Sequence, residues 1–266
     1  WSRLSPAARG DILMRARRLI AERAARFAVV ETLDSGKRLA EAEGDVGGVV
    51  KAFAYYAGAA DKLQGDSMPV GPDHIGLTIE EPVGVAAQIV PWNYPLSTAA
   101  RGIAPALAAG CTLVVKPAEQ TPFTTLMLAE LLHEAGLPAG VLNVVAGTGA
   151  EAGAALVAHP GIDHITFTGS VATGQRVMRA AAEHVTRLVL ELGGKSPLVA
   201  LRGGDCRTLA RTSCRQRESL AAGPWPERCG YRADQFGGTA RSRRRPCRSR
   251  PRRRQSHPRG WCRRAA

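Results

Sequence analysis

Two polar side chains in this chain are of types that can take part in oxyanion binding or in acid–base chemistry. Asn93 lies between the two prolines of VPWNYP (90–95). A side-chain amide on such a stiff turn can donate to an oxyanion. Glu191, in LELGGKSP (190–197), follows an apolar run, and a carboxylate at a strand end can act as a general base. A structural turn around a packed tryptophan, and a turn or capping carboxylate, are the alternative interpretations.

Two glycine-rich turns have the composition of phosphate-binding loops. AGTGAEAG contains Gly149 and Gly153, and FTGSVATG covers residues 167–174. A helix that starts directly after a strand presents free N–H groups and the positive end of its dipole, which suits a pyrophosphate. The first turn is one residue longer than the dinucleotide fingerprint, so ordinary tight turns remain an open interpretation.

A charged pair ends another apolar run, in KPAEQTP (116–122). Residues just past the carboxyl ends of parallel strands line the ligand crevice of α/β folds. Lys116 can reach a phosphate or a ribose there, and Glu119 can accept hydrogen bonds from ribose hydroxyls. A solvated surface pair is the alternative.

The elements around these residues alternate in a way that predicts an α/β fold. Residues 4–64 have helical spacing, with apolar residues Leu13, Ala16, Ile20, Ala24 and Phe27, and a second helix over 38–63. Residues 65–72 read as a turn-rich linker. Short strands are predicted around Pro82 and at 111–116, 141–145, 163–167, 187–192 and 197–201, with helices at 121–135, 150–158 and 170–183. This alternation predicts a Rossmann-like, doubly wound parallel sheet preceded by N-terminal helices.

The last 65 residues differ in composition from everything before them. Residues 202–266 hold 19 arginines, four acidic residues and five of the six cysteines, so the net charge of +13 comes entirely from this part. We expect a disordered basic tail at 202–266 and a folded domain at 1–201, helical over 1–64. The cysteine and histidine spacings predict no metal site. No signal peptide or membrane span is found, which favours a cytoplasmic protein.

The motifs PWN, KPAEQTP, FTGS and ELGGKSP, in this order, resemble those of the NAD(P)-dependent aldehyde dehydrogenase superfamily, in particular enzymes for betaine aldehyde and other small aldehydes. The resemblance runs from about residue 4 to Leu201. It implies oxidation of an aldehyde to the acid through a cysteine thiohemiacetal and thioester, with NAD as cofactor. It also implies a homo-oligomer whose interface is incomplete in this chain.

The same resemblance implies a role for each site residue. Asn93 would donate to the oxyanion, and Glu191 would activate water and can also activate the nucleophile. Lys116 and Glu119 would hold the adenosine ribose, where Glu119 would repel the 2′-phosphate of NADP. The remaining implied cofactor contacts are Ile89, Trp92, Leu192 and Gly193 on the nicotinamide side, and Gly149, Gly153, Phe167, Thr168, Gly169, Ser170 and Gly174 in the two glycine-rich turns.

The chain departs from the family pattern after Leu201. The family's cysteine segment is not recognisable, and Cys229 stands near the expected distance in unrelated surroundings. We expect an N-terminal fragment, itself lacking its first residues, with a frameshift near codons 201–203. Two alternatives stay open: an inactive NAD-binding fragment, and non-specific binding of RNA or other polyanions by the arginine-rich segment 241–264. No specific nucleic acid or membrane partner is expected.

Overall fold

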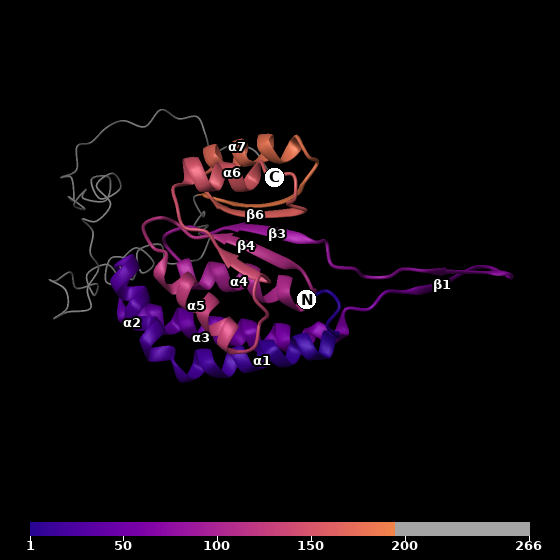
Figure 1. The fold of residues 1–266 in the computed structure, drawn as a ribbon, viewed down its shortest axis with the longest axis horizontal. Coiled ribbons are helices and arrows are strands. Elements are labelled where there is room, and N and C mark those ends of the chain that lie inside the picture. The colour runs from indigo at the N-terminus through magenta and orange to yellow at the C-terminus, as the bar shows by residue number, and fades with distance from the viewer. Residues whose placement is uncertain (195–266) are drawn as a thin grey trace, which may run out of the picture. The chain divides into compact units, whose positions relative to one another are not determined.

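A five-stranded parallel sheet with helices on both faces forms the centre of the chain in the computed structural model, which describes residues 1–194 (Figure 1). The chain enters in the middle at β3, moves outward through β4 and β5, returns to the middle at β6 and ends at β7. Every neighbouring pair is parallel. The strands are β3 (Val85–Ile89), β4 (Thr112–Lys116), β5 (Leu142–Val144), β6 (His164–Gly169) and β7 (Arg187–Leu192). The predicted Rossmann-like sheet is confirmed.

The helices divide between the two faces of the sheet. α4 (Pro95–Ala108) and α5 (Phe123–Glu134) pack on one face. α6 (Ala154–Val157) and α7 (Val171–Ala182) pack on the other. Because side chains alternate along a strand, neighbouring residues of β3 enter different cores. Ala86 joins the core of α4 and α5, while Ala87 joins the core of α6 and α7.

The N-terminal helices cover the outside of α4 and α5 (Figure 1). They are α1 (Pro6–Glu22), α2 (Ala24–Ser35) and α3 (Leu39–Ala59), followed by the short η1 (Ala60–Lys62). The Ser5 hydroxyl caps α1 by accepting from the Ala8 N–H, and Pro6 suits the first turn. The predicted apolar stripe is buried except at Ala24, which is half-buried. The stripe runs through a break at Arg23, so it lies on two helices.

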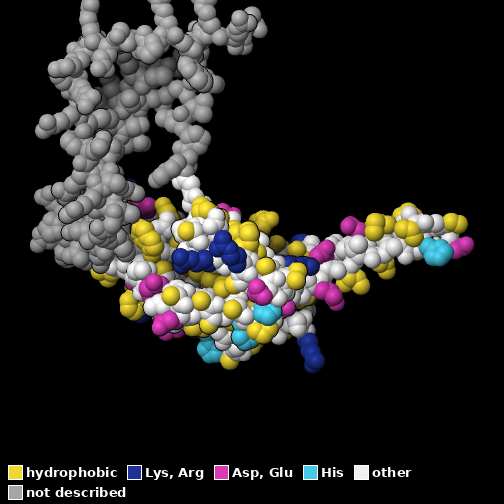
Figure 2. All heavy atoms as spheres, turned by 90° about the horizontal axis from the view of Figure 1, so that it is seen from above, with side chains coloured by type: hydrophobic (Ala, Val, Ile, Leu, Met, Phe, Trp, Pro, Cys, Tyr) yellow, Lys and Arg dark blue, Asp and Glu magenta, His cyan; other side chains and the backbone are white. Residues whose placement is uncertain are grey.

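The prediction of a linker over 65–72 was wrong. Residues Ser67–Gly71 form β1, which pairs antiparallel with β2 (His74–Leu77) in a separate two-stranded sheet. This arm projects away from the helices (Figure 1), and hydrophobic side chains lie along it (Figure 2). Pro69 reads as a turn residue, but a strand with a free edge tolerates a missing N–H.

The two short strands predicted on either side of Pro82 are confirmed as β2 and β3, and α4 had no specific prediction. The predicted strand at 197–201, the tail at 202–266 and Cys229 lie outside the described residues. Within residues 1–194, no helix combines the length and the apolar content needed to cross a membrane.

Candidate active site

The predicted site residues gather at one edge of the sheet because they follow parallel strands. The carboxyl ends of β3, β4, β6 and β7 all lie at this edge. The pairing continues into the loops: the Val90 N–H donates to the Lys116 carbonyl at 3.0 Å, and the Gly193 N–H donates to the Gly169 carbonyl, also at 3.0 Å. The loops that carry Asn93, Glu119, Ser170 and Gly193 are therefore neighbours.

Lys116 is a buried cation at the end of β4. Its side chain is 3% exposed, and Nζ donates to the Pro117 carbonyl at 2.9 Å and to Glu119 Oε2 at 3.2 Å. The Glu119 side chain stays 44% exposed. A hydrogen bond from its own backbone N–H, together with Lys116, holds the pKa of Glu119 below its usual value. A solvated surface pair does not fit this arrangement, because the ammonium group is withdrawn from water while the carboxylate faces it.

Gly153 shows how the first glycine-rich turn meets this pair. A Cβ at position 153 would lie 3.6 Å from Lys116 Cδ, so the turn packs directly on the lysine stem. The turn itself begins at Thr148, whose hydroxyl accepts from the Glu151 N–H, and continues as the π-helical η2 (Gly149–Gly153) into α6. Gly149 is exposed, whereas Gly153 is buried.

The second glycine-rich turn begins the longer helix α7. Ser170 is its N-cap, and its hydroxyl accepts from the Thr173 N–H at 3.2 Å. The first N–H groups of a helix lack partners within the helix and attract anions. A Cβ at Gly174 would approach Leu192 Cδ2 to 2.5 Å, so α7 packs closely on the Leu192 side chain. The turn therefore places a helix N-terminus close against β7.

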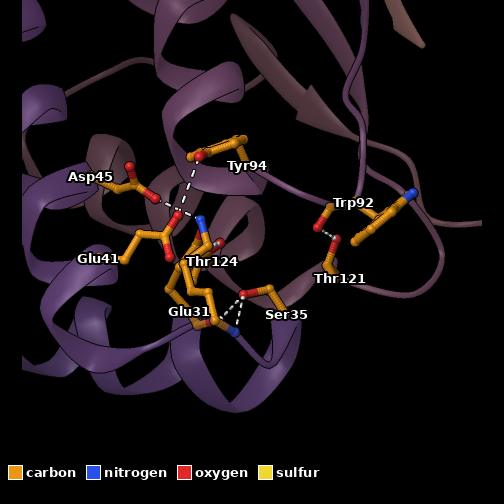
Figure 3. A network of polar contacts seen from close by, with 9 residues as sticks. Glu31, Ser35, Glu41, Asp45, Trp92, Tyr94, Thr121 and Thr124 are labelled. Carbon is orange, nitrogen blue, oxygen red and sulfur yellow. Dashed lines mark hydrogen bonds and ion pairs between the residues drawn. The ribbon is translucent and has the colours of Figure 1, made fainter. Parts of the chain in front are cut away.

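Asn93 lies on the short connection between β3 and α4. Its side chain is exposed, and the structure gives its amide no hydrogen-bond partner among residues 1–194. Both of its neighbours are held, as Figure 3 shows: the Thr121 hydroxyl donates to the Trp92 carbonyl at 3.2 Å, and the Tyr94 hydroxyl donates to Glu41 Oε1 at 3.2 Å. The connection thus presents an unpaired amide from an anchored backbone.

Glu191 lies on the opposite face of the sheet from Lys116. Leu188 and Leu190 of β7 pack towards α6 and α7, so Val189 and Glu191 face the other way. They line a cleft of about 1140 Å³ on the α4 side. Its polar lining includes Gln88 of β3, Thr98 of α4, and Thr166 and Thr168 of β6. A ligand that reaches both Lys116 and Glu191 has to cross the edge of the sheet.

The remaining predicted residues lie at the same edge, but not all of them offer a side chain. Thr168 pairs with Glu191, and Gly169 pairs with Leu192. Ile89 pairs with Phe167, and both belong to the core beneath α6 and α7. Phe167 is only 4% exposed. Any ligand contact at Phe167 would therefore have to use its backbone.

Three residues at this edge were not predicted from the sequence. Gln88, Lys37 and Thr121 are all buried and polar, and each contacts the β3–α4 connection or the helix that follows it. Gln88 Nε2 donates to the Thr98 carbonyl at 2.7 Å. The sequence carried no periodic signal for them, because their importance comes from contacts between segments far apart in the chain.

The described residues offer neither a thiol at this edge nor a metal site. Cys111, the free cysteine within residues 1–194, is buried before β4, at the opposite edge of the sheet. The same residues contain no cluster of three or more His, Cys, Asp or Glu arranged for a metal ion.

Comparisons with known proteins agree with this geometry. The family model described as "Aldehyde dehydrogenase family" matches residues 1–222. Hydroxyisobutyraldehyde dehydrogenase of Mycolicibacterium austroafricanum is 51% identical over 199 residues, covering 75% of this chain and 40% of that protein. The chain thus spans well under half the length of this relative.

Solved structures give the same result. Betaine aldehyde dehydrogenase from Staphylococcus aureus in complex with NAD+ is 44% identical, with a TM-score of 0.71 over 73% of this chain and 39% of that one. An NAD-dependent aldehyde dehydrogenase from Sinorhizobium meliloti is 43% identical, with a TM-score of 0.73 over 74% of this chain and 39% of that one. On the sheet order, the site at its edge and these matches, the chain belongs to the aldehyde dehydrogenase family.

Proposed function

We propose that the chain binds NAD at the carboxyl edge of the sheet and supplies this half of an aldehyde-oxidising site. The observation that carries the proposal is the buried Lys116, which is paired with the solvent-facing Glu119 and packed against Gly153. Lys116 and Glu119 would hold the adenosine ribose, and the N-terminus of α7 at Ser170 would take the pyrophosphate. The NAD complex of the Staphylococcus aureus relative supports this choice of cofactor.

NAD accepts a hydride from the substrate carbon when it is bound at such a site. The chain's own residues would act before and after that transfer. The Asn93 amide would donate to the oxyanion formed when a thiol adds to the aldehyde, and the Glu191 carboxylate would take a proton from the water that releases the acid. No thiol among residues 1–194 lies at this edge, and Cys229, which stands in unrelated sequence surroundings, lies outside the described residues.

The partners follow from the same proposal. The substrate class is a small aldehyde, supported by relatives named for hydroxyisobutyraldehyde and betaine aldehyde. We place the reaction in the cytoplasm and expect the chain to associate with copies of itself. The exposed Glu119 carboxylate would repel the additional phosphate of NADP, so NAD should bind more tightly.

Calorimetric titration of the full chain with NAD and with NADP tests the cofactor proposal. Lys116→Met removes a charged donor and should weaken NAD binding about tenfold or more, the effect of losing a hydrogen bond from a charged group. Lys62→Met is the matched control, because Lys62 forms an exposed ion pair with Asp61 away from the site and should leave NAD binding unchanged. Equal affinity for NAD and NADP, or normal NAD binding by Lys116→Met, would contradict the proposal.

Turnover is tested separately by aldehyde-dependent formation of NADH. The chain should be assayed beside a version whose reading frame is restored after Leu201. NADH formation only by the restored version, with NAD binding by both, would identify this chain as an inactive NAD-binding fragment. NADH formation by the chain as written would show that a thiol is supplied after residue 194.

A further inference from the structure

A buried charged cluster lies beneath the connection that carries Asn93, and the proposed chemistry does not use it. The cluster consists of Lys37, Glu31, Asp45 and Thr124. We propose that Lys37 is a positioning residue: by holding the ring of Tyr94, it fixes the Trp92–Tyr94 segment and thereby the Asn93 amide. This inference rests on the proposed role of Asn93.

Lys37 is held in place by two carboxylates. Nζ lies 3.2 Å from Glu31 Oε1 and 2.5 Å from Asp45 Oδ2, and its side chain is 7% exposed. Glu31 is fully buried and also accepts a hydrogen bond from the Thr124 hydroxyl at 2.6 Å. The ammonium group is therefore fixed by carboxylates of α2 and α3, and Thr124 of α5 holds one of these carboxylates, so its position is set before any contact with Tyr94 is counted.

The fixed ammonium group lies under the ring of Tyr94. Lys37 Nζ is 4.3 Å from the ring centroid, within the range of a cation–π contact. The Tyr94 hydroxyl also donates to Glu41 on α3. Figure 3 shows Tyr94 on the side of Glu41 and Asp45, and Trp92 beside Thr121. Asn93 stands between these two attachments, each of which joins the connection to a different part of the helical layer.

The electrostatics of the cluster favour keeping the cation under the ring. Burial alone lowers the pKa of Lys37, but the hydrogen bond that Lys37 donates to Asp45 and the charges of Glu31 and Asp45 outweigh it, so the pKa is raised. Burial is also the main cause that raises the pKa of Glu31. Buried ion pairs stabilise a fold little compared with apolar packing. The cluster can instead fix the orientation of the Tyr94 ring, because the ring is attracted to the Lys37 cation. An apolar side chain in place of Lys37 would not provide this attraction.

The test uses Trp92 as a probe of the connection. A parent protein carries Trp1→Phe, Trp225→Phe and Trp261→Phe, so that Trp92 is the sole tryptophan of the four in the chain. Its fluorescence anisotropy without ligand reports the order of the connection, and quenching by added NAD reports affinity. Further changes in this parent are Lys37→Met, Lys37→Arg and Tyr94→Leu. Tyr55→Leu is the control, because Tyr55 is an exposed tyrosine of α3 whose ring packs on Tyr56.

Lys37→Met and Tyr94→Leu should each lower the anisotropy of Trp92 and weaken NAD binding about three- to tenfold, the range of a partly desolvated cation–π contact. Lys37→Arg keeps a cation under the ring and should restore both readouts, which a purely structural role of Lys37 would not require. Tyr55→Leu should change neither.

Unchanged Trp92 anisotropy in Tyr94→Leu would overturn the proposal. That variant decides the question even if Lys37→Met does not fold, because Tyr94 is 41% exposed and all three ions stay in place. A parent that does not bind NAD would refute the proposed function alone, since the anisotropy comparison needs no cofactor.

Discussion

At the scale of single residues, Asp34 of α2 connects the N-terminal helices to the start of α5, directly after KPAEQTP. Its Oδ2 accepts a hydrogen bond from the Phe123 N–H at 3.0 Å, at the first residue of α5. Burial raises the pKa of Asp34 to about 6; the Phe123 hydrogen bond opposes this shift, and the charge of Glu31 adds to it. The carboxylate thus caps α5 at an electrostatic cost.

The raised pKa of Asp34 predicts a pH dependence of stability with a definite sign. Between the ordinary value of 3.8 and about 6, the folded chain binds more protons at this site than the unfolded chain, so its contribution to stability falls as pH rises. Asp34→Asn keeps an acceptor for the Phe123 N–H and removes the charge. The melting temperature of Asp34→Asn, relative to the original chain, should therefore be higher at pH 7 than at pH 4.

Thermal unfolding followed by circular dichroism measures this difference. Carboxylates that do not interact with Asp34 titrate equally in both proteins, so their effects cancel in the comparison. A difference in melting temperature that stays constant from pH 4 to pH 7 would show that Asp34 is not perturbed.

The position of a candidate site residue in the fold was predictable where a strand leads directly into a polar motif. Lys116, Glu119, Ser170 and Glu191 follow apolar runs, and parallel strands bring such residues to one edge. Lys37 could not be found in this way. It follows a helix in an ordinary-looking segment, and its role depends on a contact with Tyr94, 57 positions later in the sequence.

At the scale of elements, α4 packs on β3 through a glycine. A Cβ at Gly102 would lie 2.3 Å from Gln88 Cδ, and Gln88 is only 2% exposed. Gln88 Oε1 has no hydrogen-bond partner among the described residues, although its Nε2 donates to Thr98 of the same helix. The glycine therefore makes room for a buried amide between helix and sheet.

Gly102→Ala should destabilise the fold by about 1–3 kcal/mol, because overpacking displaces Gln88 and its hydrogen bond to Thr98. Gly47→Ala is the matched control within α3, where a Cβ would meet nothing within 4 Å. It should stabilise the fold by about 0.5–1 kcal/mol through helix propensity. Urea unfolding of both variants measures the two effects, and an equal response at the two positions would disprove the packing argument.

The elements that the sequence predicted well were those with clear boundaries. β4, β6 and β7 are short apolar runs bounded by polar or turn residues, and α5 and α7 have clear starts. β1 was predicted as part of a linker and α4 had no specific prediction, and both elements contain proline. Pro69 lies in an exposed strand with a free edge, and Pro95 opens the first turn of its helix, so neither removes a hydrogen bond that the element needs.

At the scale of the whole molecule, the β1–β2 arm carries apolar side chains into solvent. Met68, Val70, Ile75 and Leu77 are between 45% and 77% exposed. An isolated two-stranded sheet is marginally stable in water, and exposed apolar edges promote association. The arm therefore supports the proposed association between copies of the chain.

Ile75→Lys should reduce association without lowering the melting temperature, because Ile75 lies outside both apolar cores. Leu33→Lys on α2 changes the charge equally at another exposed apolar residue and should leave association unchanged. Sedimentation velocity over a range of concentrations measures the difference. Identical sedimentation of Ile75→Lys and the original chain would exclude the arm as the associating surface.

The position of β3 between β4 and β6 also determines when the sheet can close as the chain is synthesised. The Val85 N–H donates to Asp163, 78 positions later, and β3 pairs with β6 just beyond. At about 5–20 residues per second, translation needs roughly 4–16 s to deliver that partner. The edge of β3 that pairs with β6 therefore stays unpaired on the ribosome during this time. Nascent chains should depend on chaperones until β6 has been synthesised.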